Sequence, residues 1–190
     1  MMPIMKRWAG AVVVASALAV AAVPLAAQTT TNKTSFAYKG TPLGSSVTDF
    51  LNGNSEFKCD PIRPASEVDC YSRSTTYAGF EVEQVHAIFL EGKLSYVEIS
   101  VNKKSEQAIA TYTFRMIEQA LGEKYGAPTR STGKLGNLDM TYSIWKSDRS
   151  SIQLSQSTSA ATSIVGVMIA RDDHWARAVD LRKSKAKSDI

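Results

Sequence analysis

Apolar and polar residues alternate along several short stretches of the chain, which predicts strands with one buried face. Residues 94–101 show the alternation most regularly, and residues 80–90 show it with a change of phase near Gln84. Gly92 lies between these two stretches and predicts the tip of a hairpin. Further strands are predicted over residues 138–145, 151–156 and 164–170.

The stretch 138–145 also assigns residues to faces of the sheet. Met140, Tyr142 and Ile144 alternate with polar neighbours, so the pattern predicts that they point into the core. Trp145 is out of phase with these three residues, and we expect it on the opposite face.

One long stretch has helical periodicity instead. Residues 104–125 carry an apolar stripe that we expect to face the core, and Gly126 predicts the end of the helix. A short helix is predicted over residues 45–53, and another after Asp172 or Asp173. The stripe of the long helix comprises Ile109, Tyr112, Met116, Ile117, Ala120, Leu121 and Tyr125.

Residues 57–71 contain the two cysteines of the chain, Cys59 and Cys70. In an oxidising compartment such a close pair predicts a structural disulfide. The alternative is a metal or redox pair, but the chain has no CxxC motif and no histidine near these cysteines. Pro61 and Pro64 predict an irregular loop here, because proline cannot donate to a strand ladder.

The order of these elements predicts an α+β fold, an antiparallel β-sheet with two helices packed on one face. A helix followed by strands occurs twice, which also favours a pseudo-duplicated helix-then-meander unit. The predicted organisation is a signal peptide (1–27), a flexible lead-in (28–35), a single α+β domain (36–170), and a short helix with a basic disordered tail (171–190).

The first 27 residues predict export. Lys6 and Arg7 precede an uncharged run over residues 9–23, and the small pair Ala26 and Ala27 follows it, which is the order of a secretory signal peptide. The run is short for a membrane-spanning helix, so a retained anchor is the less favoured alternative and we expect no membrane span after leader removal. The sequence therefore predicts a periplasmic or secreted protein.

Charge excludes one class of partner. The formal net charge of +4 comes from the leader and the C-terminal tail, and residues 28–170 carry equal numbers of basic and acidic side chains. A balanced domain without a basic stripe argues against nucleic-acid binding, which requires clustered lysine and arginine.

Two turn-forming segments carry a resemblance to known proteins. Gly40-Thr-Pro-Leu-Gly-Ser-Ser-Val and Leu121-Gly-Glu-Lys-Tyr-Gly-Ala-Pro-Thr resemble small exported bacterial proteins with β-lactamase-inhibitor-protein-like folds or the SmpA/OmlA envelope domain. The lipobox cysteine of the lipoprotein branch is absent here, and the second segment inserts Glu-Lys-Tyr before Gly-Ala-Pro. The resemblance implies a binding or assembly role in the envelope of a Gram-negative bacterium, and it transfers no functional residue.

Catalytic patterns are sparse. His86 lies in a predicted strand opposite Tyr96 or Glu98, so it is either a general base oriented by a carboxylate or an ordinary surface histidine. His174 follows two aspartates, but consecutive residues point in different directions, so we predict no metal site there. The sequence has no nucleophile elbow and no phosphate-binding glycine loop, and it implies no cofactor.

Aromatic residues are the preferred candidates for binding. Tyr96, Trp145 and Tyr77 come from predicted strands or loops, and tyrosine and tryptophan are enriched at interaction surfaces. The alternative is that they form a second packed layer. We expect an exported non-catalytic binding or envelope-assembly module whose partner is an envelope or secreted protein. A small periplasmic hydrolase using His86 and a purely structural envelope protein are the alternatives.

Overall fold

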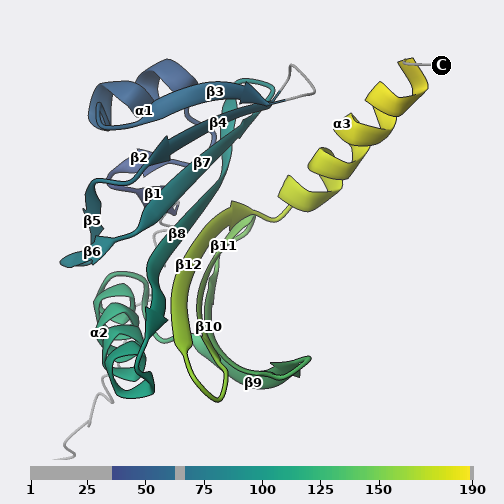
Figure 1. Ribbon diagram of the computed structural model, residues 1–190. Coiled ribbons are helices and arrows are strands. Elements are labelled where there is room, and N and C mark those ends of the chain that lie inside the picture. The colour runs from purple at the N-terminus through teal and green to yellow at the C-terminus, as the bar shows by residue number, and fades with distance from the viewer. Residues whose placement is uncertain (1–35, 63–66, 189–190) are drawn as a thin grey trace, which may run out of the picture. The chain divides into compact units, whose positions relative to one another are not determined.

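The computed structural model describes residues 36–62 and 67–188, and most of them form antiparallel β-sheet (Figure 1). The predicted leader and lead-in lie outside the described residues. The helices are α1 (Val47–Gly53), α2 (Gln107–Tyr125) and α3 (His174–Ser188). The α+β class and the antiparallel sheet predicted from the sequence are confirmed.

Eight strands form one sheet in the order β3-β4-β7-β8-β12-β11-β10-β9, and each neighbouring pair is antiparallel. Their bounds are β3 (Lys58–Ile62), β4 (Glu67–Ser72), β7 (Gln84–Leu90), β8 (Lys93–Ser105), β9 (Thr129–Leu135), β10 (Leu138–Lys146), β11 (Ser150–Thr158) and β12 (Ser163–Arg171). Two short hairpins join β1 (Ala37–Tyr38) to β2 (Thr41–Pro42) and β5 (Thr75–Tyr77) to β6 (Phe80–Val82).

The hairpin of β7 and β8 forms where the sequence predicts it. Glu91 and Gly92 both have positive φ, 51° and 72°, as the two-residue turn of a tight hairpin requires. The phase change near Gln84 marks the boundary between β6 and β7. The apolar strand β12 lies centrally, between β8 and β11.

Two regions of the eight-stranded sheet form strands that the sequence did not predict. Residues around Cys59 and Cys70 pair as β3 and β4, so the expectation of an irregular loop there was wrong. Pro61 is tolerated because β3 is an edge strand and has one free side. The other edge strand, β9, is exposed at all seven residues and so has no apolar alternation to reveal it.

Register divides the sheet into two faces, because directly paired residues point the same way. One face, which we call the core face, bears a paired row of buried residues across β7, β8, β12 and β11. These are Val85, Ile99, Val167 and Leu154. We call the opposite side the outer face, which bears the paired row His86, Glu98, Met168 and Gln153.

Helix α1 begins at its cap and is anchored by one aromatic side chain. The hydroxyl of Ser46 accepts a hydrogen bond from the backbone N–H of Asp49 at 3.1 Å, which stabilises the first turn. Phe50 is fully buried, with its ring centroid 5.5 Å from that of Phe89 on β7. The short helix therefore gains its stability from docking on the sheet.

Helix α2 contacts β8, β11 and β12, and two residues of the predicted stripe, Ile117 and Leu121, are buried as expected. Ile109, Tyr112 and Met116 are exposed, so their assignment to the core was wrong. The helix carries apolar residues over a broad arc, and the sheet covers only one side of it. The buried residues are Ala110, Thr113, Phe114, Ile117 and Leu121.

The C-terminal helix is longer than the sequence suggests. Residues 174–188 are helical, so the prediction of a disordered tail from Arg182 was wrong for its described part. The side chains of His174 and Ala178 are buried. Arg177 forms an ion pair with Glu91 in the β7–β8 turn, which fixes the start of α3 beside this end of the sheet.

Candidate functional site

The three aromatic residues predicted to form a binding surface are not jointly exposed. Trp145 is 3% exposed and lies on the core face, paired with Ile152 of β11. Its indole Nε1 donates a hydrogen bond to the carbonyl oxygen of Gly126 at 2.7 Å. Tyr77 is half-buried against the core, with its ring parallel to that of Tyr38. Trp145 lies on the face opposite Met140, Tyr142 and Ile144, as expected, but that face is the core face, so the assignment of those three residues to the core was wrong.

Tyr96 is on the outer face but is covered. Its ring stacks on the ring of His174 at 4.8 Å between centroids, and it is 9% exposed. Its hydroxyl donates to a carboxylate oxygen of Glu98 at 3.1 Å. Burial first, and the neighbouring Glu98 charge second, raise the pKa of Tyr96 above its ordinary value of 10.0. This part of the face is a packed layer, as the alternative interpretation proposed, with His174 as the covering side chain.

A polar pocket of about 620 Å³ lies at the β3 edge of the outer face. Its base is the paired row Lys58, Tyr71 and His86, one residue from each of β3, β4 and β7. Asp60 and Asp69, paired with each other, line one end. The other lining residues are Glu56, Ser72, Arg73, Ser74 and Gln84.

His86 is oriented by a carboxylate, although not the one that the sequence suggested. Its Nδ1 lies 2.9 Å and 3.0 Å from the two carboxylate oxygens of Asp69 on β4. Glu98 is directly paired with His86 in the register, but it bonds to Tyr96 instead. The prediction of a histidine beside a carboxylate holds, and the identity of that carboxylate as Glu98 was wrong.

The second ring nitrogen of His86 is also occupied. Its Nε2 is in short hydrogen-bond contact with the side-chain amide Nε2 of Gln84. A neutral imidazole that donates from Nδ1 to Asp69 and accepts at Nε2 from Gln84 satisfies both contacts. Among the described residues, no serine hydroxyl bonds to this ring.

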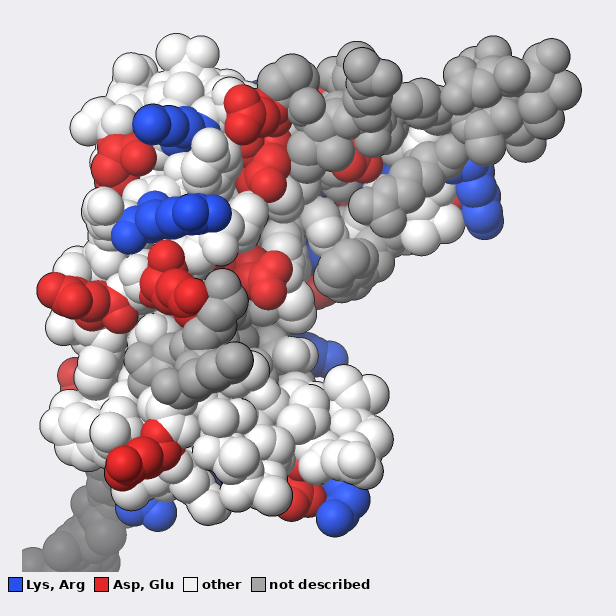
Figure 2. Space-filling model, in the orientation of Figure 1, with Lys and Arg blue, Asp and Glu red and all other residues white. Residues whose placement is uncertain are grey.

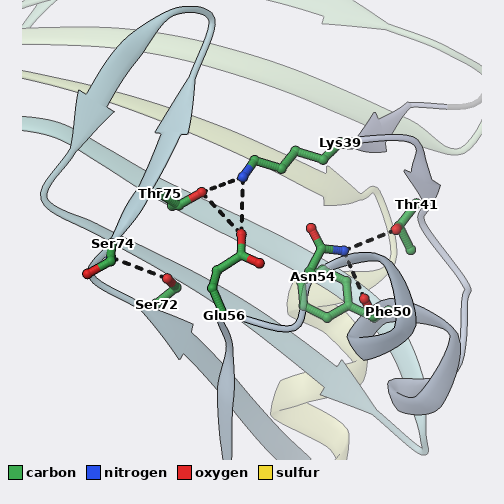
Figure 3. A network of polar contacts seen from close by, with 8 residues as sticks. All are labelled: Lys39, Thr41, Phe50, Asn54, Glu56, Ser72, Ser74 and Thr75. Atoms are coloured by element: carbon green, nitrogen blue, oxygen red, sulfur yellow. Dashed lines mark hydrogen bonds and ion pairs between the residues drawn. The ribbon is translucent and has the colours of Figure 1, made fainter.

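The rim of the pocket is held by a polar network that reaches back to the N-terminal hairpin (Figure 3). Lys39, in the β1–β2 turn, donates to Glu56 at 3.1 Å and contacts Thr75, which itself donates to Glu56 at 3.2 Å. Burial opposes ionisation of Glu56, but hydrogen bonds and the Lys39 charge outweigh it and lower its pKa. Glu56 is therefore a fixed anion whose partner is Lys39.

The remaining charges of the pocket are uncommitted. Among the residues that the structure describes, Lys58, Arg73 and Asp60 are exposed and have no ion-pair or hydrogen-bond partner from side chains. Figure 2 shows acidic and basic side chains interleaved near α1 and β3, with no large patch of one sign. The pocket therefore offers charges of both signs to a polar ligand.

A second polar pocket lies beside α2, on the core face of β9, β10 and β11. Glu118 accepts hydrogen bonds from Arg130 Nε at 2.8 Å and Nη2 at 2.9 Å, and from the buried hydroxyl of Ser143. These bonds, the Arg130 guanidinium first, lower the pKa of Glu118 against the opposing effect of burial. Each group of this cluster is matched by a partner within the protein, which is typical of a structural network.

The described residues contain no cluster of three or more histidine, cysteine, aspartate or glutamate side chains that could hold a metal ion. Among the same residues, no helix has the length and apolar character needed to cross a bilayer. Comparisons with protein-family models, curated proteins and solved structures found no match for this chain.

The sequence contained one signal for the β3–β4 part of this pocket, and that signal depends on the disulfide. Cys59 and Cys70 form the predicted bridge and are directly paired across β3 and β4. Reading outward from that pairing in antiparallel register places Asp60 opposite Asp69 and Lys58 opposite Tyr71. Because we expected an irregular loop here, we did not predict this register.

Proposed function

We propose that the protein is an exported, non-catalytic binding module that holds part of an envelope or secreted partner in the pocket of Lys58, Asp60, Arg73 and His86. The observation that carries this proposal is the set of charges without partners, gathered in a hollow beside an oriented histidine. Polar side chains converging in a concave site are the usual mark of ligand recognition. The disulfide is compatible with an oxidising periplasmic or secreted location.

The proposed architecture supports this assignment. We infer that α1 and α2 both pack on the core face, because Phe50 and Phe114 belong to one buried cluster with Val97 and Leu154. The sheet also consists of two halves of four strands, each in chain order from its edge strand to the centre. The halves are β3-β4-β7-β8 and β9-β10-β11-β12, and they meet at the β8–β12 pair. This order favours a duplicated helix-then-meander unit, in which the helices occupy one face and binding uses the other.

Cross-linking capture from the native envelope tests the binding role. The bait is the oxidised chain from Gln28 onward, compared with a Lys58→Gln/Arg73→Gln variant and with Lys146→Gln, an exposed lysine on the outer face away from the pocket. We expect one reproducible partner that the double variant loses and the Lys146 variant keeps. A partner that all three proteins retain would place binding elsewhere and remove this proposal.

A small hydrolase is the second candidate, favoured by the Asp69 contact to His86 Nδ1, which is the orientation that a general base requires. The Gln84 contact to Nε2 opposes it, because a general base needs that nitrogen free to accept a proton. The discriminating measurement is turnover of ester and peptide substrates by wild type and His86→Ala. Turnover that depends on His86 would favour the enzyme, and equal rates would remove it.

A further inference from the structure

We infer that the pocket recognises the free C-terminal carboxylate of an extended peptide segment, bound between Lys58 and Arg73 with its preceding backbone directed toward Asp60. This inference rests on the proposed function and adds the class of ligand. Three properties of the pocket lead to it: the cations without partners, the order of the charges along the strands, and the hydroxyl groups beside them.

The two cations without partners favour a ligand with a single carboxylate. Asp69 is engaged by His86 and Glu56 by Lys39, so neither is free to meet a ligand. Lys58 and Arg73 have no such partner, and a carboxylate placed between them meets both cations. A polyamine would be repelled by these cations, and a phosphate dianion would be repelled more strongly than a carboxylate by the nearby Asp60 and Asp69.

The spacing of the charges fits a short extended chain. Lys58 and Asp60 are two residues apart on β3, which corresponds to about 7 Å along the strand. Arg73 lies two residues beyond Tyr71, the residue paired with Lys58, on the side away from Asp60. Arg73 directly follows β4, so Lys58 and Tyr71 lie between Asp60 and Arg73 in the order of the paired strands, which suits a short extended segment.

Hydroxyl groups beside these charges can meet a peptide backbone. Tyr71 and Ser74 line the pocket, and their hydroxyls can each donate and accept hydrogen bonds. Asp60, as an acceptor, suits a backbone N–H two residues before the carboxylate. Arginine binds a carboxylate with two parallel hydrogen bonds, so we expect Arg73 to contribute more than Lys58.

Titration with three peptides tests the inference: N-acetyl-Ala-Ala-Ala with a free carboxylate, the same peptide as its C-terminal amide, and N-acetyl-Ala-Glu-Ala amide, which carries an internal carboxylate. Binding to the ¹⁵N-labelled, oxidised chain from Gln28 onward is followed by amide chemical shifts, which also report that each variant is folded. We expect the free acid to shift residues of β3 and β4 and to bind at least tenfold more tightly than either amide.

The variants connect the preference to named residues. We expect Arg73→Gln to bind the free acid no more tightly than the corresponding amide, whereas Lys146→Gln should bind all three peptides as wild type does. Because the charges are exposed, affinity for the free acid should also fall as salt is raised. Equal binding of acid and amide, retention of the preference in Arg73→Gln, or tighter binding of inorganic phosphate would overturn the inference.

The failure of this inference is distinguishable from that of the proposed function. If none of the peptides binds but envelope capture still depends on Lys58 and Arg73, the ligand class is wrong and the binding role stands. If the peptides do not bind and capture is independent of these residues, both are wrong.

Discussion

At the scale of single residues, the buried indole N–H of Trp145 has a hydrogen-bond partner, the carbonyl oxygen of Gly126. Gly126 caps the C-terminal end of α2, where carbonyl groups have no donors within the helix, and the indole supplies one donor. Trp145 thus connects the end of α2 to β10 while filling the core beside Ile152. Its role in the folded protein is structural.

We expect Trp145→Phe to lower the free energy of unfolding by about 1–2 kcal/mol, because the ring is largely retained but the Gly126 carbonyl loses its donor. Urea denaturation measures the loss. Tyr142→Phe is the matched control, since Tyr142 is half-buried on the outer face of the same strand and should change stability by about 0.5 kcal/mol or less. Equal losses in the two variants would contradict a specific role for the indole bond.

Glu118 gives a prediction that depends on pH. Its side chain is 13% exposed and its folded pKa is lowered from the ordinary 4.5, so the ionised form contributes stability above pH 4.5 that is lost as pH falls through the folded pKa. Arg130 is largely exposed, which limits the effect. We expect Glu118→Gln to cost about 1 kcal/mol at pH 7.

The difference between wild type and Glu118→Gln should shrink as the solution is acidified below pH 4.5, because the wild-type carboxyl then also becomes neutral. Thermal unfolding at a series of pH values measures it. A difference that stays constant from pH 7 to pH 3 would show that the charge of Glu118 is not the source of its contribution.

At the scale of elements, the disulfide connects an edge strand to its only neighbour in the sheet. β3 is a five-residue edge strand that contains Pro61, and it pairs on one side only, with β4. The Cys59–Cys70 bridge crosses that pair with 3.9 Å between the Cα atoms. Since β3 and β4 contribute half of the residues that line the pocket, the bridge also stabilises the candidate site.

We expect replacement of both cysteines by serine to lower the free energy of unfolding by about 3 kcal/mol, the loop-closure value for a sequence separation of 11. Chemical denaturation of the oxidised protein and of the double variant gives the difference. Adding a reductant should bring the wild type to the stability of the variant. A loss below about 1 kcal/mol would indicate that β3 and β4 are held by the sheet alone.

Helix α3 acts as a cover for one part of the outer face. His174 stacks on Tyr96, and burial is the first cause of the raised pKa of that tyrosine. We therefore expect His174→Ala to bring the pKa of Tyr96 down toward its ordinary value of 10.0. Titration of the tyrosine ring signals by NMR measures the change. An unchanged pKa of Tyr96 would show that its environment does not depend on the His174 ring.

At the scale of the whole molecule, the sheet separates the hydrophobic core from the candidate site. The core face carries the buried aliphatic side chains, whereas the outer face carries a covered region at Tyr96 and the polar pocket at the β3 edge. A pocket built on paired strands is pre-organised, because the ladder fixes the positions of Lys58, Tyr71 and His86 before a ligand arrives.

Export, which the order of the first 27 residues predicts, is open to a direct test. Expressed in a Gram-negative host, the full chain should be recovered from the periplasm with a mass reduced by that of about 27 residues, as the order of charged, apolar and small residues predicts. Val14→Arg places a charge in the apolar run and should leave the unprocessed chain in the cytoplasm. Full-length protein in the periplasm would contradict cleavage.

The sequence by itself determined the class of fold, both hairpin strands around Gly92, the extents of α1 and α2, the central place of β12 and the Cys59–Cys70 bridge. These features follow from local causes: periodicity, turn glycines and caps act between residues that are near in sequence. The faces of α2 and β10 needed the tertiary structure, because each carries apolar residues on two sides and only packing selects one.

The candidate site also required the tertiary structure. Asp69 and His86 are 17 residues apart, and their contact depends on the pairing of β4 with β7. Lys58, Asp60 and Arg73 are ordinary surface residues in the sequence, and their gathering in one pocket depends on the strand register and on the edge position of β3. Local pattern reports which residues prefer burial, whereas register decides which polar side chains meet.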